Sequence, residues 1–576
     1  MGSHKRISRA LSIFAVIALL ATACSKSTTS SGGGGGGGTT EPHKGGSLIF
    51  GAEQWADCLN PILSCGSASW AYYTVFEHVL PRAMYIDLEG NYVASPLLTE
   101  TPTTDNGGVM PPMGGKPFTL TFHIDPKAIW SDGTPITSED FDFTWKAIMN
   151  TTGSLSKAGY DEVTSIDTSD PQTVVIEFSD VYADWWDMWG GVTGYVLEKA
   201  AFPDVDPSKP DLQNEMKEMV SFSGGPWTLK SWSKEEAVLV RNDKYWGTQT
   251  LLDQVTFVPR EDINTEVQSL LNGEVDAIYP QPSNVSLLDQ FAANPNVEAV
   301  GGGSTFVDAL WLNLSSPPLD DLKVRQALAY AIDRQSVVDN IIKLNNPDAE
   351  VLNCMGQWIP GMGPWCDNTQ FAKYTYDPAQ SIKILESDGY DCSAVADGPC
   401  TKDGQPLEID YYSNAGNTRR DDTKQLVKEA AIPAGFQLNL KTVASGPYFG
   451  KVMPQGQFQM ADYAGGAVDP TVTFEFACKY FPTEANNWSG YNWDRWCNPE
   501  ADKAMFASDK ELDVTKRAEL IHQVGAFTAQ DIPAIPMYVL PSVTAWRSDH
   551  VAGPIGDYNA SIYGPVFNMN EWYTVG

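Results

Sequence analysis

Basic side chains are scarce in this chain, and the shortage excludes one class of partner. The 576 residues include 38 Lys and Arg against 72 Asp and Glu, which gives a formal net charge of −34 at pH 7. A protein that binds nucleic acid needs a basic surface for the phosphate backbone. We therefore expect no nucleic-acid partner, and we interpret the excess of acids as a solvated surface of an exported protein.

The sequence also lacks the short motifs of common catalytic and metal sites. It contains no G-x-S-x-G, P-loop, H-E-x-x-H or protein-kinase signature, and no C-x-x-C. The six histidines are scattered along the chain: His4, His43, His78, His123, His522 and His550. We expect no metal site, no cofactor and no enzyme activity. With 72 acids, a secreted glycoside hydrolase that uses two carboxylates stays open as an alternative.

Long apolar runs are missing except at the N-terminus, where Leu11–Leu20 follows a basic segment. This run is about half of the roughly 20 residues that a membrane-spanning helix needs. Small residues follow it, so the pattern predicts a cleaved signal over residues 1–23. The sequence from Leu20 to Cys24 resembles the end of a bacterial lipoprotein signal, which implies that Cys24 carries a lipid. An ordinary secretory signal with an incidental cysteine is the alternative.

The next segment, residues 24–45, is low in complexity and contains seven consecutive glycines from Gly32 to Gly38. Such a composition cannot bury apolar surface and behaves as a flexible tether. A lipid at Cys24 followed by this tether would keep the folded part close to a membrane.

Cysteine usage agrees with export. Without Cys24, eight cysteines remain, and an even number in an exported chain predicts disulfides. Pairing between sequence neighbours predicts four bonds: Cys58–Cys65, Cys354–Cys366, Cys392–Cys400 and Cys478–Cys497. This assignment rests on proximity alone, because eight cysteines allow about 105 connectivities.

The middle of the chain contains a strand, a sharp turn and a helix in quick succession. Phe306–Leu314 is mostly apolar and predicts a strand, and Ser315–Pro318 ends it because two prolines fix φ and remove backbone donors. Asp320 or Asp321 is the expected cap of a helix. Its apolar positions follow the spacing of an amphipathic helix: Val324, Ala327, Leu328, Ala331 and Ile332. We interpret this stretch as the first crossing between two lobes, and Asp531–Tyr538 as the final one.

These residues carry a resemblance to a known family. Asn313, Val324–Ala327 and Ala331–Arg334 form the pattern N-x5-L-x-D-x-x-V-R-Q-A-x-x-x-A-I-D-R. It closely resembles the extracytoplasmic solute-binding proteins of peptide-type ABC importers, the oligopeptide, dipeptide and nickel group of solute-binding family 5. A second motif of that family, F-x-L-x-F followed by W-S-D-G-x-P-x-T-x-x-D-F, covers Phe118–Phe141.

The resemblance implies an α/β, periplasmic-binding-protein-like fold (type II, cluster C) with two lobes, a hinge and an extra mixed α/β domain. The predicted boundaries are residues 46–83, 222–305 and 538–576 for lobe I, 84–221 for the extra domain of lobe I, and 306–537 for lobe II, the ligand-binding lobe.

Local patterns predict several elements of these parts. In lobe II, strands are expected over residues 407–412 and 436–443 and a helix over 421–431, an alternation typical of a parallel-type sheet with helices on both faces. In the extra domain, Thr137 and Asp140 have the spacing of a capping box that opens a helix.

The resemblance also indicates where a ligand would bind. It makes Trp55 and Trp70 candidate cleft aromatics of lobe I, and Tyr463 and Asp469 candidates of lobe II. Trp488 and Tyr491 are further candidates of lobe II because they belong to an aromatic run near the proposed Cys478–Cys497 bond; structural burial is the alternative for each tryptophan. In peptide-binding members, an aspartate a few residues before the proline of the loop 463–471 pairs with the peptide ammonium. Here Gly465–Val468 precede Asp469-Pro470. Unless Asp469 or Asp462 substitutes, we expect a ligand held mainly by backbone and apolar contacts, or one without an amine.

Together these patterns predict a substrate-binding lipoprotein that captures peptides between two lobes and delivers them to an ABC permease and its ATPase. We expect a monomer that is extracytoplasmic and attached to the membrane by its lipid. The alternative ligands are non-peptide solutes such as an oligosaccharide or a metal chelate, since aromatic side chains also stack on sugars.

Overall fold

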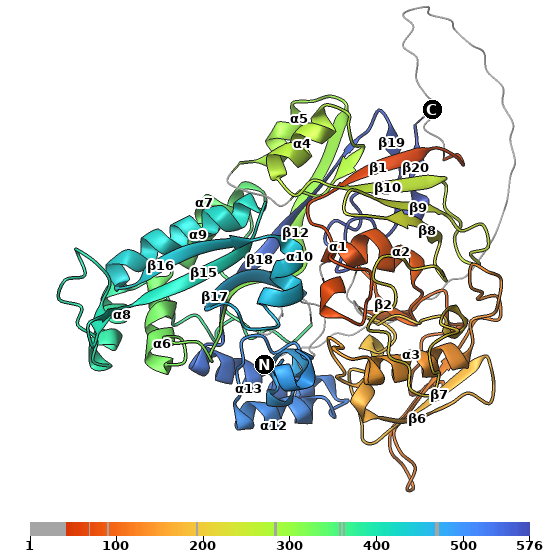
Figure 1. Ribbon diagram of the computed structural model, residues 1–576, viewed down its shortest axis with the longest axis horizontal. Coiled ribbons are helices and arrows are strands. Elements are labelled where there is room, and N and C mark those ends of the chain that lie inside the picture. Colours follow the sequence, from red (N-terminus) through yellow and green to blue (C-terminus); the bar gives the residue numbers. More distant parts are fainter. Residues whose placement is uncertain are drawn as a thin grey trace, which may run out of the picture. The chain divides into compact units, whose positions relative to one another are not determined.

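A large mixed sheet organises the folded part of the chain. The computed structural model describes residues 42–67, 69–88, 91–191, 194–280, 285–355, 359–360, 363–466 and 472–575 (Figure 1). Within them, ten strands pair in the order β16-β15-β17-β12-β18-β11-β1-β10-β9-β8. The predicted signal, Cys24, most of the tether and Asp469 lie outside the described residues.

The sheet has two ends, each built from a different part of the chain. The first end contains β1 (Ser47–Ala52), β8 (Trp227–Trp232), β9 (Ala237–Arg241), β10 (Gln254–Pro259) and β11 (Ala277–Ile278). The second end contains β15 (Glu408–Asn414), β16 (Gln437–Val443) and β17 (Met460–Gly466). β15 runs parallel to both of its neighbours, as the alternation of helices and strands predicted.

Two long strands join these ends, β12 (Val297–Leu312) and β18 (Ala534–Arg547). They pair with each other in antiparallel fashion from Val297 to Trp311, with a register shift between Gly303 and Val307. β12 also pairs with β17 of the second end, and β18 also pairs with β11 of the first end, so the pairing of β12 with β18 joins the two ends (Figure 1). The sheet is mixed, because β1 and β15 run parallel to their neighbours whereas β8, β9, β12 and β18 form antiparallel pairs.

Each end of the sheet has its own hydrophobic core. One core includes Phe50, Phe257 and Trp572, and another includes Leu310 and Val324. Burying one such apolar side chain contributes about 1.5–3 kcal/mol. Each end is therefore stabilised by its own packing, while β12 and β18 connect the two.

Helices flank the sheet at both ends. Those of the first end are α1 (Ser69–Ala71), α2 (Glu77–Val79), α4 (Ile263–Leu271) and α5 (Leu287–Ala292). Those of the second end are α6 (Leu322–Ala331), α7 (Arg334–Asn340), α8 (Pro378–Ser387), α9 (Thr418–Ala431), α10 (Ser445–Pro447), α11 (Thr473–Phe476), α12 (Pro499–Ser508) and α13 (Val514–Asp531). The predicted cap of α6 is Asp321, whose side chain accepts a hydrogen bond from the Lys323 amide at 2.8 Å.

Residues between α2 and β8 form the extra mixed α/β domain. Its antiparallel sheet has the order β4-β5-β7-β6, with β4 (Val109–Met110), β5 (Thr119–His123), β6 (Val163–Asp167) and β7 (Thr173–Phe178). Helix α3 (Ser138–Asn150) begins with the predicted capping box, in which the Thr137 amide donates to Asp140 at 2.9 Å. The apolar residues of this domain, such as Phe122 and Phe141, belong to the same core as Phe50. The extra domain is therefore continuous with the first end of the sheet.

Short pairs of strands complete the described elements: β2 (Met84–Ile86) with β3 (Tyr92–Ala94), β13 (Thr401–Lys402) with β14 (Gln405–Pro406), and β19 (Val551–Ala552) with β20 (Tyr573–Thr574).

The largest differences from the boundaries expected from sequence are at the starts of two elements. The first crossing strand begins at Val297 rather than Phe306, because pairing with β18 keeps the backbone of Gly301–Gly303 extended despite the low strand propensity of glycine. Helix α9 begins at Thr418 rather than Asp421, because the Asn417 side chain accepts a hydrogen bond from the Arg420 amide at 3.0 Å and caps the helix earlier.

Four disulfides are present in the described residues. They join Cys58 to Cys65, Cys354 to Cys366, Cys392 to Cys400, and Cys478 to Cys497. Their sequence separations run from 7 to 19 residues, so each bond closes a local loop within one part of the fold.

Candidate ligand-binding site

The two tryptophans proposed for lobe I are buried in this conformation. Trp55 is 5% exposed, and its Nε1 donates a hydrogen bond to the Ser233 carbonyl at 2.8 Å. Trp70 is 1% exposed, and its Nε1 donates to Glu53 Oε1 at 3.0 Å. Both rings support the region where the chain leaves β1, and direct contact with a ligand stays a prediction for each.

Two of the lobe II candidates lie in one aromatic cluster. Tyr463, on β17, stacks on Trp311 of β12 with ring centroids 4.6 Å apart. Tyr491 stacks on Trp493 at 4.3 Å, and Trp493 contacts the Tyr463 ring at 5.6 Å. The structure thus brings Tyr463 and Tyr491 together through Trp493.

Trp488 is not part of this cluster among the described contacts. It is half-buried, and its backbone amide donates to the Thr483 carbonyl at 2.7 Å. Asp469 lies outside the described residues.

A buried carboxylate that the sequence reasoning missed stands beside the aromatic cluster. Glu475, on α11, is 1% exposed. Burial raises the pKa of both Tyr463 and Tyr491, and the nearby charge of Glu475 raises it further. Tyr72, which lies between α1 and α2 of the first end, also contributes to raising the pKa of Tyr491. In the sequence, Glu475 lies in the run T-F-E-F shortly after the loop, whereas the family's acid is expected before Pro470.

A second missed feature is a buried charge cluster at the start of α9. Arg419 donates to Asp308 of β12 at 2.7 Å, with 0% and 1% of the two side chains exposed. Arg420 lies 3.4 Å from Asp462 of β17. Burial raises the pKa of Asp308, but Arg419 and Arg420 outweigh it and hold the pKa below its usual value. Burial and the charge of Asp308 raise the pKa of Asp462.

This cluster also acts on the first end of the sheet. Burial raises the pKa of Glu53, and the hydrogen bond from Trp70 and the charges of Arg420 and Arg419 lower it in part. An acid that follows β1 and two arginines of α9 therefore attract each other across the boundary between the two ends.

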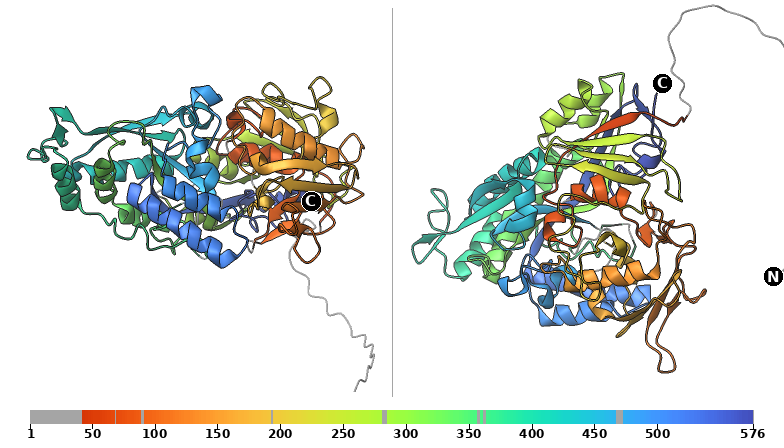
Figure 2. Two further views of the ribbon diagram at one scale, coloured as in Figure 1. Left: turned by 90° about the horizontal axis from the view of Figure 1, so that it is seen from below. Right: turned by 45° about the vertical axis from the view of Figure 1, so that its right-hand side comes forward.

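The extra domain contacts the second end of the sheet directly. Leu155 follows α3 in the chain, yet it is 7% exposed and packs in the core that contains Leu310. Its carbonyl accepts a hydrogen bond from the Gly490 amide at 3.0 Å, while its own amide donates to Ile62 at 2.7 Å. Farther along this contact, Arg517 of α13 forms a buried ion pair with Asp184, and Figure 2 shows α12 and α13 beside the extra domain.

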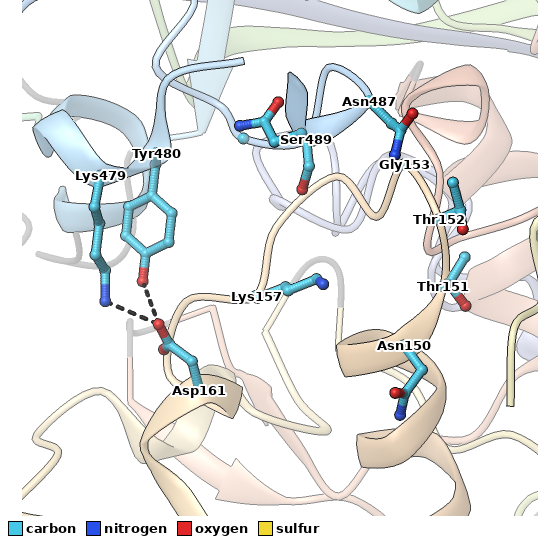
Figure 3. A pocket seen from close by; sticks show the side chains of 12 residues that line it. Asn150, Thr151, Thr152, Gly153, Lys157, Asp161, Lys479, Tyr480, Asn487 and Ser489 are labelled. Atoms are coloured by element: carbon cyan, nitrogen blue, oxygen red, sulfur yellow. Dashed lines mark hydrogen bonds and ion pairs between the residues drawn. The ribbon is translucent and has the colours of Figure 1, made fainter. Parts of the chain in front are cut away.

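Between these segments lies a pocket of about 460 Å³ (Figure 3). Residues of the α3 C-terminus and the following loop form one wall, and residues 479–490 form the other. At its edge, Asp161 binds Lys479 at 2.8 Å and accepts a hydrogen bond from the Tyr480 hydroxyl at 3.4 Å. The walls are mainly neutral and polar.

Comparison with known proteins places this architecture. The family described as bacterial extracellular solute-binding proteins, family 5, matches residues 116–487. The chain belongs to this family. As a family 5 protein it has the fold that the sequence predicted, a periplasmic-binding-protein-like arrangement of mixed α/β lobes.

Relatives of this family 5 protein bind different solutes. The oligopeptide-binding protein OppA of Mycobacterium tuberculosis (strain ATCC 25618 / H37Rv) is 25% identical over 492 residues, covering 82% of this chain and 76% of OppA. The structure of AppA from Bacillus subtilis in complex with a nonapeptide has a TM-score of 0.77 and 19% identity, covering 93% of this chain and all of AppA. The periplasmic EDTA-binding protein EppA has a TM-score of 0.76 and 20% identity over 94% of this chain and 98% of EppA.

Two classes of site are not found in the part of the family 5 chain that the structure describes. No helix there combines the length and the apolar character that crossing a membrane requires. No group of His, Cys, Asp and Glu side chains in the described ranges is arranged to hold a metal ion.

Proposed function

We propose that this family 5 protein is the substrate-binding component of an ABC importer, and that it captures peptides between its two lobes. The observation that carries the proposal is the β12–β18 pairing, through which the two ends of the described ten-strand sheet are joined. Two ends with separate cores and a two-strand connection can rotate as rigid bodies about that connection. We assign the predicted lobe and extra-domain boundaries to these parts.

Closure is the step at which the protein would sense its ligand. A ligand held between the lobes contacts both of them only in the closed form, so it shifts the population toward that form by its difference in affinity. The permease would then recognise the closed lobes. An extended peptide suits such a cleft because its backbone can be bound independently of its side chains.

The aromatic cluster of β17 supports a place for the peptide ammonium. Tyr463 and Tyr491 pack with Trp311 and Trp493 in this cluster, and the buried Glu475 beside them supplies a carboxylate. An ammonium group between a carboxylate and aromatic rings gains a charge-assisted hydrogen bond and cation–π attraction. We therefore propose that Glu475 takes the role expected of an acid before Pro470, which revises the expectation of a ligand without an amine.

The remaining parts of the proposal concern the site of action. Cys24 would carry a lipid, and residues 24–45 would tether a monomeric binding protein to the outer face of the cell membrane, near the permease and its ATPase. Support comes from the signal pattern over residues 1–23 and the glycine run that follows it.

Calorimetry with short synthetic peptides tests the proposal. We expect binding of a pool with free N-termini, and a loss of about tenfold or more when the same pool is N-acetylated or when Glu475→Gln replaces the wild type. Binding that is equal for free and acetylated pools would contradict the role of Glu475. Binding of neither pool would contradict peptide capture and favour a non-peptide solute such as a metal chelate.

A further inference from the structure

The pocket between the extra domain and lobe II has an uneven distribution of charge. Three charged residues line it: Lys157, Asp161 and Lys479. Asp161 is engaged by Lys479 at 2.8 Å and by Tyr480 at 3.4 Å. The Lys157 ammonium donates to the Met149 carbonyl at 2.8 Å, and no ion pair with a carboxylate is found for it among the described residues. One positive charge is therefore left uncompensated in the lining.

Hydrogen-bond donors from both walls of the pocket point into it. Figure 3 shows the Lys157 ammonium and the Asn487 side chain directed into the pocket from the extra domain and from lobe II. An ammonium group has three N–H donors, of which one is used here, and an amide has two. No hydrogen bond of the Asn487 side chain occurs among the described contacts. A lysine and an amide from opposite walls are suited to a small planar anion.

The charge and the number of oxygens of an anion decide whether it matches the donors of this pocket. A carboxylate carries one charge and two oxygens, which matches one ammonium and one amide. A phosphate carries more charge and needs more donors than this lining supplies. In a chain with a net charge of −34, an uncompensated lysine in a pocket marks a place where a negative group is accepted.

We propose that this pocket is a carboxylate subsite, in which Lys157 and Asn487 bind the C-terminal carboxylate of a peptide or another carboxylate of the ligand. The inference rests on the proposed function and deepens it, because the ligand then bridges the extra domain and lobe II. Such a ligand favours the closed form through contacts that the two lobes alone do not provide. The extra domain thereby becomes part of the recognition of the ligand.

Paired peptide pools test the subsite. Short synthetic peptides with free C-termini are compared with the same pool as C-terminal amides by calorimetry, for wild type, Lys157→Gln and Lys157→Arg. We expect the wild type to prefer the free acids by about tenfold, Lys157→Gln to lose that preference, and Lys157→Arg to keep it. Lys209→Gln, at an exposed lysine of the same domain, is the matched control and should behave as the wild type.

A preference for free acids that survives in Lys157→Gln would overturn the subsite. If neither pool binds, peptide capture fails, and the subsite is then judged by thermal unfolding with succinate and with inorganic phosphate. A rise in Tm with succinate in the wild type and none in Lys157→Gln supports it. Equal responses of the two proteins to succinate, or a larger response of the wild type to phosphate, overturn it.

Discussion

At the scale of single residues, substitution at the buried pair of Arg419 and Asp308 is expected to lower the stability of the fold most clearly. Removing one partner of a buried ion pair costs about 3–5 kcal/mol, and Arg420, 3.8 Å from Asp308, compensates the remaining charge only in part. We expect Arg419→Met to lower the free energy of unfolding by that amount in urea denaturation. Lys343→Met breaks an exposed pair with Asp339, at 2.7 Å and with both side chains at least 40% exposed, and should cost less than about 1 kcal/mol. Similar losses for the two variants would contradict this account.

The buried Asp494 leads to a prediction about how the stability of the protein depends on pH. Burial raises the pKa of this carboxyl to about 8, although the Trp496 amide and Arg495 lower it in part. In the unfolded chain an aspartate has a pKa of about 3.9, so raising the pH from about 4 to about 8 removes a proton from the unfolded chain first and favours unfolding. Asp494→Asn cannot lose that proton. Its stability advantage over the wild type should therefore grow across this range to more than about 1 kcal/mol and stay constant above it.

Urea titrations of both proteins between pH 4 and 9 measure this difference. The comparison cancels other groups that titrate nearby, among them His78, whose pKa burial lowers to about 4. Parallel pH profiles for wild type and variant would show that Asp494 is charged in the folded protein.

The side chains of the candidate site show how much of it can be predicted from the sequence alone. Tyr463 was singled out from the family's ligand-binding loop and Tyr491 from an aromatic run, and the two lie in one cluster. Glu475 and Arg419 were missed because their importance comes from burial against strands that are distant in the sequence. The sequence contains 72 acidic residues, and which of them are buried becomes clear only in the folded structure, where β12 and β17 pair.

At the scale of elements, the glycine run Gly301–Gly303 of β12 is a position where a substitution is expected to restrict the movement of the two lobes. A Cβ added at Gly302 would meet no atom within 4 Å, whereas one at Gly301 would lie 2.9 Å from Leu288. Gly302→Ala is therefore tolerated sterically and should change stability by no more than about 1 kcal/mol, through loss of unfolded-state freedom. It should reduce the range of lobe opening.

Distances between fluorophores on the two lobes, measured by single-molecule energy transfer, test this prediction. Gly398→Ala is the matched control, because a Cβ there also meets nothing within 4 Å and the position lies far along the chain from β12. A variant at Gly302 that samples the same distances as the control would show that the bend occurs elsewhere.

Elements with strong local signals were predicted well, and those that depend on partners were not. The capping box of Thr137 and Asp140 and the cap at Asp321 are local and are confirmed. The N-terminal half of β12 has little strand propensity of its own and exists because β18 pairs with it. A strand of this kind is visible only in the folded sheet.

At the scale of the whole molecule, Leu155 links the extra domain to the core of lobe II. A charged side chain at this position would be buried without a partner in the closed form, which is costly, but would be solvated in an open form. Leu155→Asp should therefore shift the protein toward the open form and increase its radius of gyration in X-ray scattering with peptides present. Leu512→Asp, at a residue that is 40% exposed, should leave the scattering unchanged, and an unchanged profile for Leu155→Asp would contradict the link.

The four disulfides have a consequence for how such a protein matures outside the cytoplasm. Each bond spans at most 19 residues, so a thiol oxidant can complete it as soon as that short stretch has emerged from the export channel. β18 emerges near the end of the chain, and no described disulfide depends on its arrival. Under the proposed function, oxidation would fix individual loops early and would leave the angle between the lobes to the ligand rather than to covalent bonds.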